Sequence, residues 1–144
     1  MIHDNSQSRP KAPLVGIDNF NCPSGAESFF YKTLDGVNLR IAIWNQSSSK
    51  GTVLLQSGRT EFIEKYYEVI QEFIQRGFCV ALMDWRGQGL SERVAKDIRI
   101  GHVKNFGDYD SDFEEVIEKV YQDSCPRPWI AVGHSMGGCL VAST

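Results

Sequence analysis

Residues 132–138 read Val-Gly-His-Ser-Met-Gly-Gly, between an apolar run before them and a run of small residues after them. This order predicts a strand, a sharp turn and a helix, with Ser135 at the turn. Gly133 and Gly137 stand two residues on either side of the serine, where side chains would collide in so tight a turn. The Ser135 hydroxyl would project above the end of a sheet. The backbone N–H of Met136, at the start of the helix, would face developing negative charge.

The same pattern has a second interpretation. Gly-x-Ser-x-Gly occurs by chance, and a glycine-rich turn from strand to helix can bind a phosphate or simply pack. Here the context favours a reactive serine, because residues 129–132 have the composition of a buried strand and residues 139–143 are small and compatible with a helix. A non-catalytic α/β module that binds a small anion or a partner chain at the turn stays as the alternative.

Composition limits the class of protein. A chain of 144 residues that is 42% hydrophobic and 23% charged has the size and composition of a globular domain. The net charge of -3 argues against nucleic acid as a main partner. No apolar stretch is long enough to span a bilayer, and the first residues lack the basic-then-apolar layout of a signal peptide.

The cysteines lack the spacing of metal ligands. We interpret them as buried free thiols, which suit a reducing compartment and predict a cytoplasmic protein. They are Cys22, Cys79, Cys125 and Cys139.

Strands and helices are expected to alternate along the chain. Residues 1–25, rich in Pro, Ser and Asn, predict a flexible arm before a domain over residues 26–144. Asp35-Gly36 predicts a hairpin. In its second strand Leu39, Ile41 and Ile43 alternate with more polar residues, which predicts that only one face is buried. The strands are expected at 27–33, 38–45, 52–56, 78–83 and 129–132, and the amphipathic helices at 63–76 and 106–120.

This order predicts an α/β fold with a mostly parallel sheet, right-handed crossovers and an N-terminal antiparallel hairpin. Ligands of such sheets bind beyond the carboxyl ends of the strands. Three segments are expected to meet there, namely residues 57–60, residues 84–89 and the serine turn.

These segments resemble the α/β-hydrolase family, and more narrowly its bacterial lysophospholipase and monoacylglycerol lipase branch. The resemblance extends over about residues 27–144, and several motifs in the same order are more specific than the pentapeptide alone. The motifs are Gln56-Ser57-Gly58-Arg59-Thr60-Glu61, Tyr66-Tyr67-Glu68, Asp84-Trp85-Arg86-Gly87-Gln88-Gly89-Leu90-Ser91, Gly101-His102-Val103, Phe106-Gly107-Asp108-Tyr109 and Gly133-His134-Ser135-Met136-Gly137-Gly138.

The resemblance implies a serine hydrolase of carboxylic esters that acts on a small, lipid-like substrate without a cofactor or metal ion. Ser135 would attack the ester carbonyl and form an acyl-enzyme, which water then hydrolyses. The backbone N–H groups of Met136 and Arg59 would hold the oxyanion. Peripheral contact with a membrane surface would suit such a substrate, although the sequence encodes no anchor.

Other polar residues near these motifs are expected to be structural. The commoner relatives have His-Gly where this chain has Ser57-Gly58, and Glu61 corresponds to a glutamate that is usually structural in the family. The position of Asp84 at the end of a strand would also suit a catalytic acid, but the favoured role is an ion pair or a turn cap. The same structural role is expected of Arg86 and Ser91.

The remaining acids and the histidines are not expected to act in catalysis. The acidic run at residues 108–112 lies where a helix dipole favours negative charge, and we expect it to be a solvated face rather than a metal site. His3, His102 and His134 are not persuasive general bases.

In this family the catalytic acid and histidine follow the serine. Residues 136–144 contain no Asp, Glu or His, and the sequence stops inside the predicted helix. We therefore interpret the chain as part of a longer hydrolase, truncated after the serine turn and inactive by itself, with Ser135 a weak nucleophile. One edge of the strand at 129–132 would be uncovered, which predicts self-association.

Overall fold

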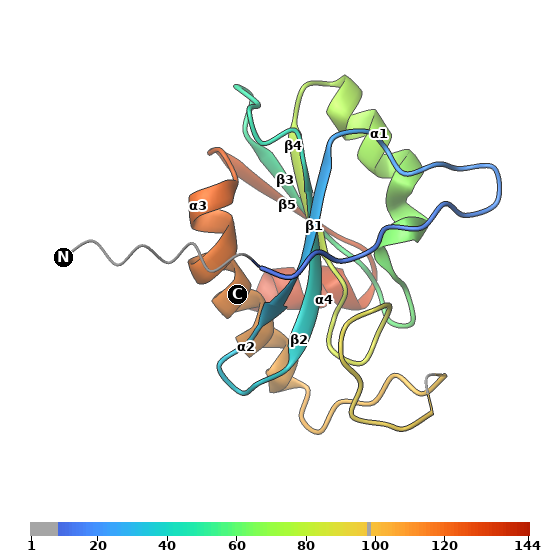
Figure 1. The fold of residues 1–144 in the computed structure, drawn as a ribbon. Coiled ribbons are helices and arrows are strands. Elements are labelled where there is room, and N and C mark those ends of the chain that lie inside the picture. Colours follow the sequence, from blue (N-terminus) through green and yellow to red (C-terminus); the bar gives the residue numbers. More distant parts are fainter. Residues whose placement is uncertain (1–8, 98) are drawn as a thin grey trace.

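The computed structural model describes residues 9–97 and 99–144, which form a five-stranded sheet between helices (Figure 1). The strands are β1 (Ala26–Lys32), β2 (Asn38–Trp44), β3 (Thr52–Gln56), β4 (Cys79–Met83) and β5 (Trp129–Gly133). Their order in the sheet is β1-β2-β4-β3-β5. Strand β3 is parallel to β4 and β5, whereas β2 pairs antiparallel with β1 and β4. The expected α/β fold, mostly parallel with an antiparallel hairpin at its start, is confirmed.

The helices lie in two layers, one on each face of the sheet (Figure 1). They are α1 (Tyr67–Gln75), which follows the 3₁₀ turn η1 (Ile63–Tyr66); α2 (Gly107–Val116), which continues through the π-helical turn η2 (Ile117–Tyr121) into α3 (Gln122–Ser124); and α4 (Met136–Ser143). Side chains alternate along β3 and β4, so Val53 and Leu82 pack toward α1 while Leu54 and Ala81 pack toward α2 and α4. Both central strands are therefore buried on both faces, as their apolar sequences predict.

The prediction that β2 is buried on only one face is wrong. Arg40 points to the α1 side, and it is fully buried because carboxylates satisfy its guanidinium group. Its Nη1 and Nη2 donate to Glu64 at 2.6 and 2.7 Å, and its Nε donates to Asp84 at 2.7 Å. A charged residue thus stands where the alternation predicted solvent, and its partners come from η1 and from the end of β4.

The N-terminal segment is described from residue 9 onward, and there it follows the open edge of β1. Ala12 N–H donates to Ser28 O at 3.0 Å, and Phe30 N–H donates to Pro10 O at 2.8 Å. Further along, the Tyr67 hydroxyl donates to a backbone carbonyl of the segment at 2.8 Å. Residues 1–8 of the expected arm lie outside the described residues.

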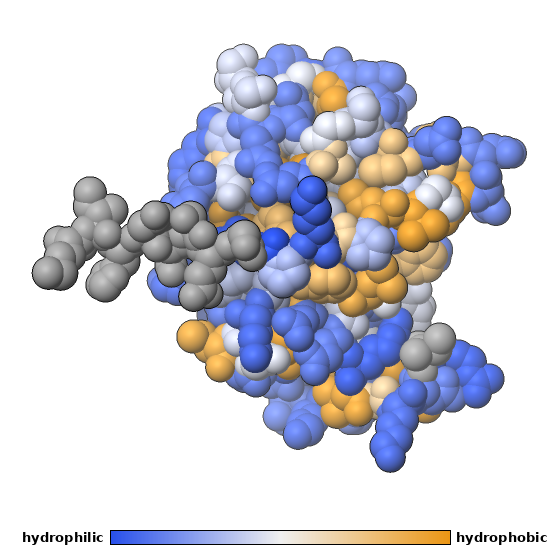
Figure 2. Space-filling model, in the orientation of Figure 1, coloured by the Kyte–Doolittle hydropathy of each residue, from blue (hydrophilic) through white to orange (hydrophobic). Residues whose placement is uncertain are grey.

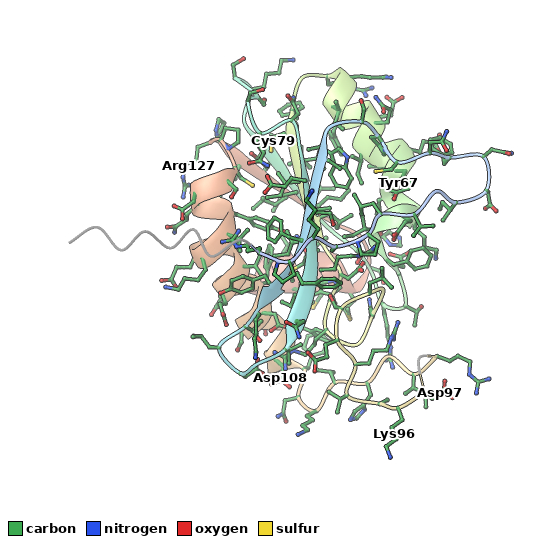
Figure 3. The ribbon with its side chains drawn as sticks, in the orientation of Figure 1. Tyr67, Cys79, Lys96, Asp97, Asp108 and Arg127 are labelled. Atoms are coloured by element: carbon green, nitrogen blue, oxygen red, sulfur yellow. The ribbon has the colours of Figure 1, made fainter. Side chains whose placement is uncertain are left out.

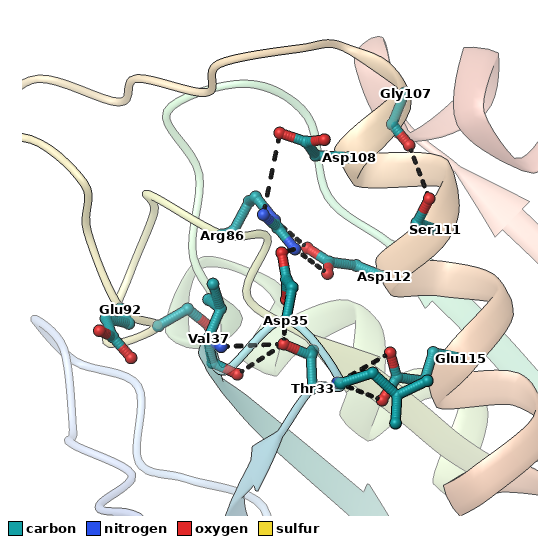
Figure 4. Close-up of polar contacts among 12 residues, drawn as sticks. Thr33, Asp35, Val37, Arg86, Glu92, Gly107, Asp108, Ser111, Asp112 and Glu115 are labelled. Carbon is teal, nitrogen blue, oxygen red and sulfur yellow. Dashed lines mark hydrogen bonds and ion pairs between the residues drawn. The ribbon is translucent and has the colours of Figure 1, made fainter.

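An ion-pair cluster around the buried Arg86–Asp112 pair attaches the loop after β4 to α2 (Figure 4). Arg86 donates to both carboxylate oxygens of Asp112, at 2.6 and 2.5 Å, and also pairs with Asp35 of the β1–β2 turn at 2.9 Å. Hydrogen bonding to Asp112 raises the pKa of Arg86 above its ordinary value. The acidic run is therefore not wholly solvated as expected, since Asp112 is almost fully buried against this arginine.

The thiols are only partly as expected. Cys79 and Cys125 are buried and Cys22 is half-buried, but Cys139 is exposed on α4, so its expected burial is wrong. Within the described ranges, no group of three or more His, Cys, Asp or Glu side chains could hold a metal ion. In the same residues, no helix is both long and apolar enough to cross a membrane.

Candidate active site

The turn between β5 and α4 holds Ser135 in a strained backbone conformation. Ser135 has φ 53° and ψ -118°, a region that residues with side chains rarely adopt, and its side chain is exposed. Gly137 N–H donates to His134 O and Gly138 N–H donates to Ser135 O, both at 3.0 Å. The strand therefore reverses into the helix within a few residues, and the serine stands at the apex.

Two close backbone approaches explain the glycines on either side of the serine. A Cβ atom at Gly133 would lie 2.6 Å from the carbonyl carbon of Gly137. A Cβ atom at Gly137 would lie 2.6 Å from the carbonyl oxygen of Ser57, in the loop after β3. Both obstacles are backbone atoms that no side-chain rotation can remove. The glycines thus let the turn close on itself and let α4 approach β3.

In the loop after β3, the backbone N–H groups on either side of Arg59 are hydrogen-bonded. Gly58 N–H donates to the Glu61 carboxylate at 2.6 Å, and Thr60 N–H donates to Gln88 Oε1 at 2.9 Å. Between them, Arg59 N–H has no hydrogen-bond partner among residues 9–97 and 99–144. Within the same residues, the N–H of Met136, at the first position of α4, has none either. These are the two N–H groups that the family resemblance implies as oxyanion donors.

Glu61 joins this loop to the serine turn. Its Oε2 accepts hydrogen bonds from Gly58 N–H at 2.6 Å and from the Tyr66 hydroxyl at 2.5 Å, and it lies 3.2 Å from His134 Nδ1. Burial acts to raise the pKa of Glu61, but the hydrogen bonds outweigh burial and leave that pKa below its ordinary value. Burial and the bond to Glu61 together raise the pKa of Tyr66. The carboxylate is thus held ionised between two loops whose relative position sets the site.

Gln88 supports the same loop from the other side. Its side-chain oxygen accepts from Thr60 N–H, and its Nε2 donates to Gly58 O at 3.1 Å and to Glu61 O at 3.3 Å. By contrast, the Ser57 hydroxyl is buried without a hydrogen-bond partner in the described part of the chain. Ser57 stands where the commoner relatives have histidine, and its hydroxyl adds no support to the loop. Sequence reasoning identified the loop but missed the roles of Gln88 and Tyr66.

The polar residues expected to be structural do form ion pairs and turn contacts. Asp84 is fully buried, and besides Arg40 it accepts hydrogen bonds from the backbone N–H groups of Ile63 and Leu90, both at 2.9 Å. The Ser91 hydroxyl donates to Asp84 O at 2.7 Å. Both carboxylate oxygens of Asp84 accept these hydrogen bonds, which agrees with a structural role.

Neither of the two described histidine side chains is hydrogen-bonded to the serine hydroxyl. The ring of His134 turns to Glu61, and His102 is exposed in the loop before α2. Among the described residues, Ser135 Oγ forms no hydrogen bond with either ring. His3 lies outside the described residues.

A mostly parallel sheet with a strained serine at a glycine-lined turn defines an α/β-hydrolase. A family model described as serine aminopeptidase, S33, matches residues 47–144. Two curated relatives are lysophospholipase L2 of Escherichia coli, 33% identical over 110 residues, and the monoacylglycerol lipase of Mycolicibacterium smegmatis, 31% identical over 109 residues. The chain belongs to the serine aminopeptidase S33 family of α/β-hydrolases, and within it is similar to lysophospholipases and monoacylglycerol lipases.

Solved structures share the fold. A thioesterase domain from the curacin biosynthetic pathway matches with a TM-score of 0.66 and 22% identity, over 83% of this chain and 41% of that chain. A monoglyceride lipase from Saccharomyces cerevisiae matches with a TM-score of 0.60 and 22% identity, over 81% and 36% of the respective chains. The two curated relatives are matched over 74% of this chain, but over only 32% and 36% of their own lengths. The chain thus spans about a third of the curated relatives it matches.

Proposed function

We propose that these residues belong to a carboxylic ester hydrolase in which Ser135 is the nucleophile, and that its substrates are monoacylglycerols or lysophospholipids. The observation that carries the proposal is the backbone of Ser135, whose positive φ holds an exposed hydroxyl at the carboxyl end of β5. A position of this kind costs conformational energy, and such strain is concentrated at functional sites. The names of the curated relatives support the substrate class.

The proposed reaction is acyl transfer in two steps. Ser135 Oγ adds to the ester carbonyl carbon, its proton passes to a general base, and the alcohol leaves as the carbonyl re-forms on an acyl-enzyme. Water then attacks the acyl-enzyme and releases the fatty acid. In both steps the carbonyl oxygen carries negative charge, which the N–H groups of Met136 and Arg59 would stabilise. Each donor of this kind typically contributes about 3–4 kcal/mol to the transition state.

The general base is the part of this reaction that the described residues do not supply. In the family the acid and histidine follow the serine in sequence, and residues 136–144 contain neither type of residue. We infer that residues 1–144 alone hydrolyse little or no ester, because an unassisted serine hydroxyl is a weak nucleophile.

The test is hydrolysis by the product of the complete open reading frame that encodes these residues. We expect it to release fatty acid from 1-oleoylglycerol or lysophosphatidylcholine, with Ser135→Ala lowering kcat by a factor on the order of 10⁴ or more. Ser111→Ala, at an exposed serine on α2, is the matched control and should leave kcat unchanged. Wild-type turnover in Ser135→Ala would refute the proposal, as would cleavage of aminoacyl nitroanilides without any ester hydrolysis.

The alternative of a non-catalytic module makes a different prediction. A fluorophosphonate probe reacts with an activated serine hydroxyl, which displaces fluoride from phosphorus. Labelling of the complete protein that is lost in Ser135→Ala supports the hydrolase. An unreactive protein, with the turn nevertheless binding phosphate, would support the module instead.

A further inference from the structure

Exposed apolar side chains are concentrated in the loop between β4 and α2. Within the described residues, nine large hydrophobic side chains are exposed, and four of them come from residues 90–106. These four are Leu90, Val94, Ile100 and Phe106, each about half exposed. Figure 2 shows hydrophobic and hydrophilic side chains side by side at the lower right, where this loop leaves the body. We call residues 90–97 and 99–106 the basic loop.

The basic loop also carries positive charge, although the protein as a whole has a net charge of -3. It contains four basic side chains against two acidic ones. The basic residues are Arg93, Lys96, Arg99 and Lys104, and the acidic residues are Glu92 and Asp97. Glu92 is occupied by hydrogen bonds from the Asn38 backbone and side chain, both at 2.9 Å, and Asp97 pairs with Arg99 at 2.8 Å. Lys96 points away from the body into solvent (Figure 3).

The base of this loop is hollowed. A cavity of about 380 Å³ lies between the basic loop, the N-terminal segment and the start of η1. Val15, Phe62 and Leu90 line it together with Arg93. Val15 is itself 56% exposed, so the apolar surface continues from the loop onto the neighbouring segment.

The position of the loop relates it to the candidate active site. It leaves the carboxyl end of β4, and the serine turn leaves the carboxyl end of β5; both strands run parallel to β3. The basic loop and Ser135 therefore lie at the same edge of the sheet. A partner bound to the basic loop would therefore lie near the carboxyl ends of the strands, where a substrate would enter.

We propose that the basic loop docks the protein on an anionic lipid surface. Exposed aliphatic side chains interleaved with lysine and arginine match the two parts of such a surface, acyl chains and negatively charged headgroups. A nucleic acid or an acidic protein would match the charges but would leave the aliphatic side chains without a role. The orientation toward the serine turn rests on the proposed function; the docking itself does not.

The experiment measures co-sedimentation of the protein with vesicles of phosphatidylcholine alone and of phosphatidylcholine mixed with phosphatidylglycerol. We expect binding to the anionic vesicles only. Lys96→Glu with Lys104→Glu should weaken that binding by about tenfold or more, since each basic side chain near such a surface contributes measurably to affinity. Both lysines are exposed and form no hydrogen bond within residues 9–97 and 99–144, so the fold should be unaffected. The matched control is Lys11→Glu with Lys32→Glu, at two exposed lysines beside and on β1 whose side chains form no hydrogen bond within the same residues.

A second variant tests the apolar half of the surface. Val94→Ser with Ile100→Ser should also weaken binding to anionic vesicles while leaving binding to heparin, a soluble polyanion, unchanged. Circular dichroism of every variant checks that the fold is intact. Equal effects of Lys11→Glu with Lys32→Glu and of the loop variants would overturn the proposal. So would vesicle binding that is insensitive to Val94→Ser with Ile100→Ser and matched by heparin, because the loop would then bind anions in general.

Catalysis is not needed for this measurement, so the two proposals fail separately. A protein that hydrolyses monoacylglycerol but binds no vesicles overturns the docking proposal alone. A protein that binds anionic vesicles through the basic loop but hydrolyses no ester overturns the proposed function alone.

Discussion

Replacing Glu61 by alanine should lower the free energy of unfolding by about 3 kcal/mol, with two hydrogen bonds contributing about 1.5 kcal/mol each. These are the bonds that the carboxylate accepts from Gly58 N–H at 2.6 Å and from the Tyr66 hydroxyl at 2.5 Å. The value is the lower end of the range for bonds to a charged group, because the Glu61 side chain is 18% exposed. We assign nothing to the His134 contact, since that ring is 65% exposed and water screens it.

The assay is urea unfolding followed by tryptophan fluorescence at about pH 7, where every carboxylate in question is ionised. The same loss corresponds to a fall in Tm of roughly 6–12 °C for a domain of this size. Glu68→Ala is the matched control, because Glu68 is exposed on α1 and its carboxylate accepts no hydrogen bond within the described ranges. It should change the unfolding free energy by less than about 0.5 kcal/mol. Amide exchange gives a local readout, since Gly58 N–H should lose protection in Glu61→Ala.

Acid pH should abolish the part of the stabilisation that depends on the charge of Glu61. The pKa of Glu61 in the folded protein lies below its ordinary value of 4.5. The contribution of its ionised form is therefore fully present above about pH 4.5 and is lost as the pH falls through the lower, folded-state pKa. Glu61→Gln keeps a similar shape without the charge, so the gap between wild type and Glu61→Gln should close on acidification. A gap that is constant with pH, or a loss in Glu61→Ala no larger than in Glu68→Ala, would refute the reasoning.

Three further perturbations test other parts of the molecule. Gly137→Ala forces a methyl group against a backbone carbonyl and should destabilise the fold by about 1–3 kcal/mol in urea unfolding, whereas Gly107→Ala, with open space around it, should not. Arg86→Met leaves a buried aspartate unpaired and should cost about 3–5 kcal/mol, against under about 0.5 kcal/mol for Arg76→Met in an exposed pair; equal losses would contradict the buried cluster. An aromatic disulfide reagent should react fastest with Cys139 in the folded protein, and an unchanged fast phase in Cys139→Ser would show that another thiol is exposed.

The features that the sequence predicted well are those set by neighbours along the chain. The serine turn depends on glycines two residues from Ser135, and the hairpin depends on Asp35-Gly36, so a short window of residues contains the whole cause. The apolar runs of β3 and β4 likewise indicate burial on both faces, because each strand has sheet neighbours and a helix layer on either side. Local steric limits and hydrophobic pattern were sufficient for the class of fold.

Two of the wrong predictions, those for Arg40 and Asp112, share one cause, which is pairing between distant residues. Arg40 stands on the face of β2 that was predicted to be exposed, yet it is buried because Glu64, 24 positions away, accepts its hydrogen bonds. The aspartate expected in solvent at position 112 is buried because Arg86 lies 26 positions earlier. A polar residue in the sequence signals exposure only when nothing pairs with it, and its partner is known only once the chain is folded.

The support of the candidate oxyanion loop depends on the same kind of pairing. Position 57, where the commoner relatives have histidine, contributes a hydroxyl without a hydrogen-bond partner within the described ranges. The loop is instead held by Glu61, whose carboxylate accepts hydrogen bonds from Gly58 N–H and the Tyr66 hydroxyl, and by Gln88, whose amide is bonded to the backbone on both sides of Arg59. The side chains of Glu61 and Gln88 therefore fix the shape of the loop around Arg59. This arrangement explains how the N–H of Arg59 keeps its place without a histidine before the glycine, and it makes the carboxylate at position 61 a link between fold stability and the geometry of the proposed site.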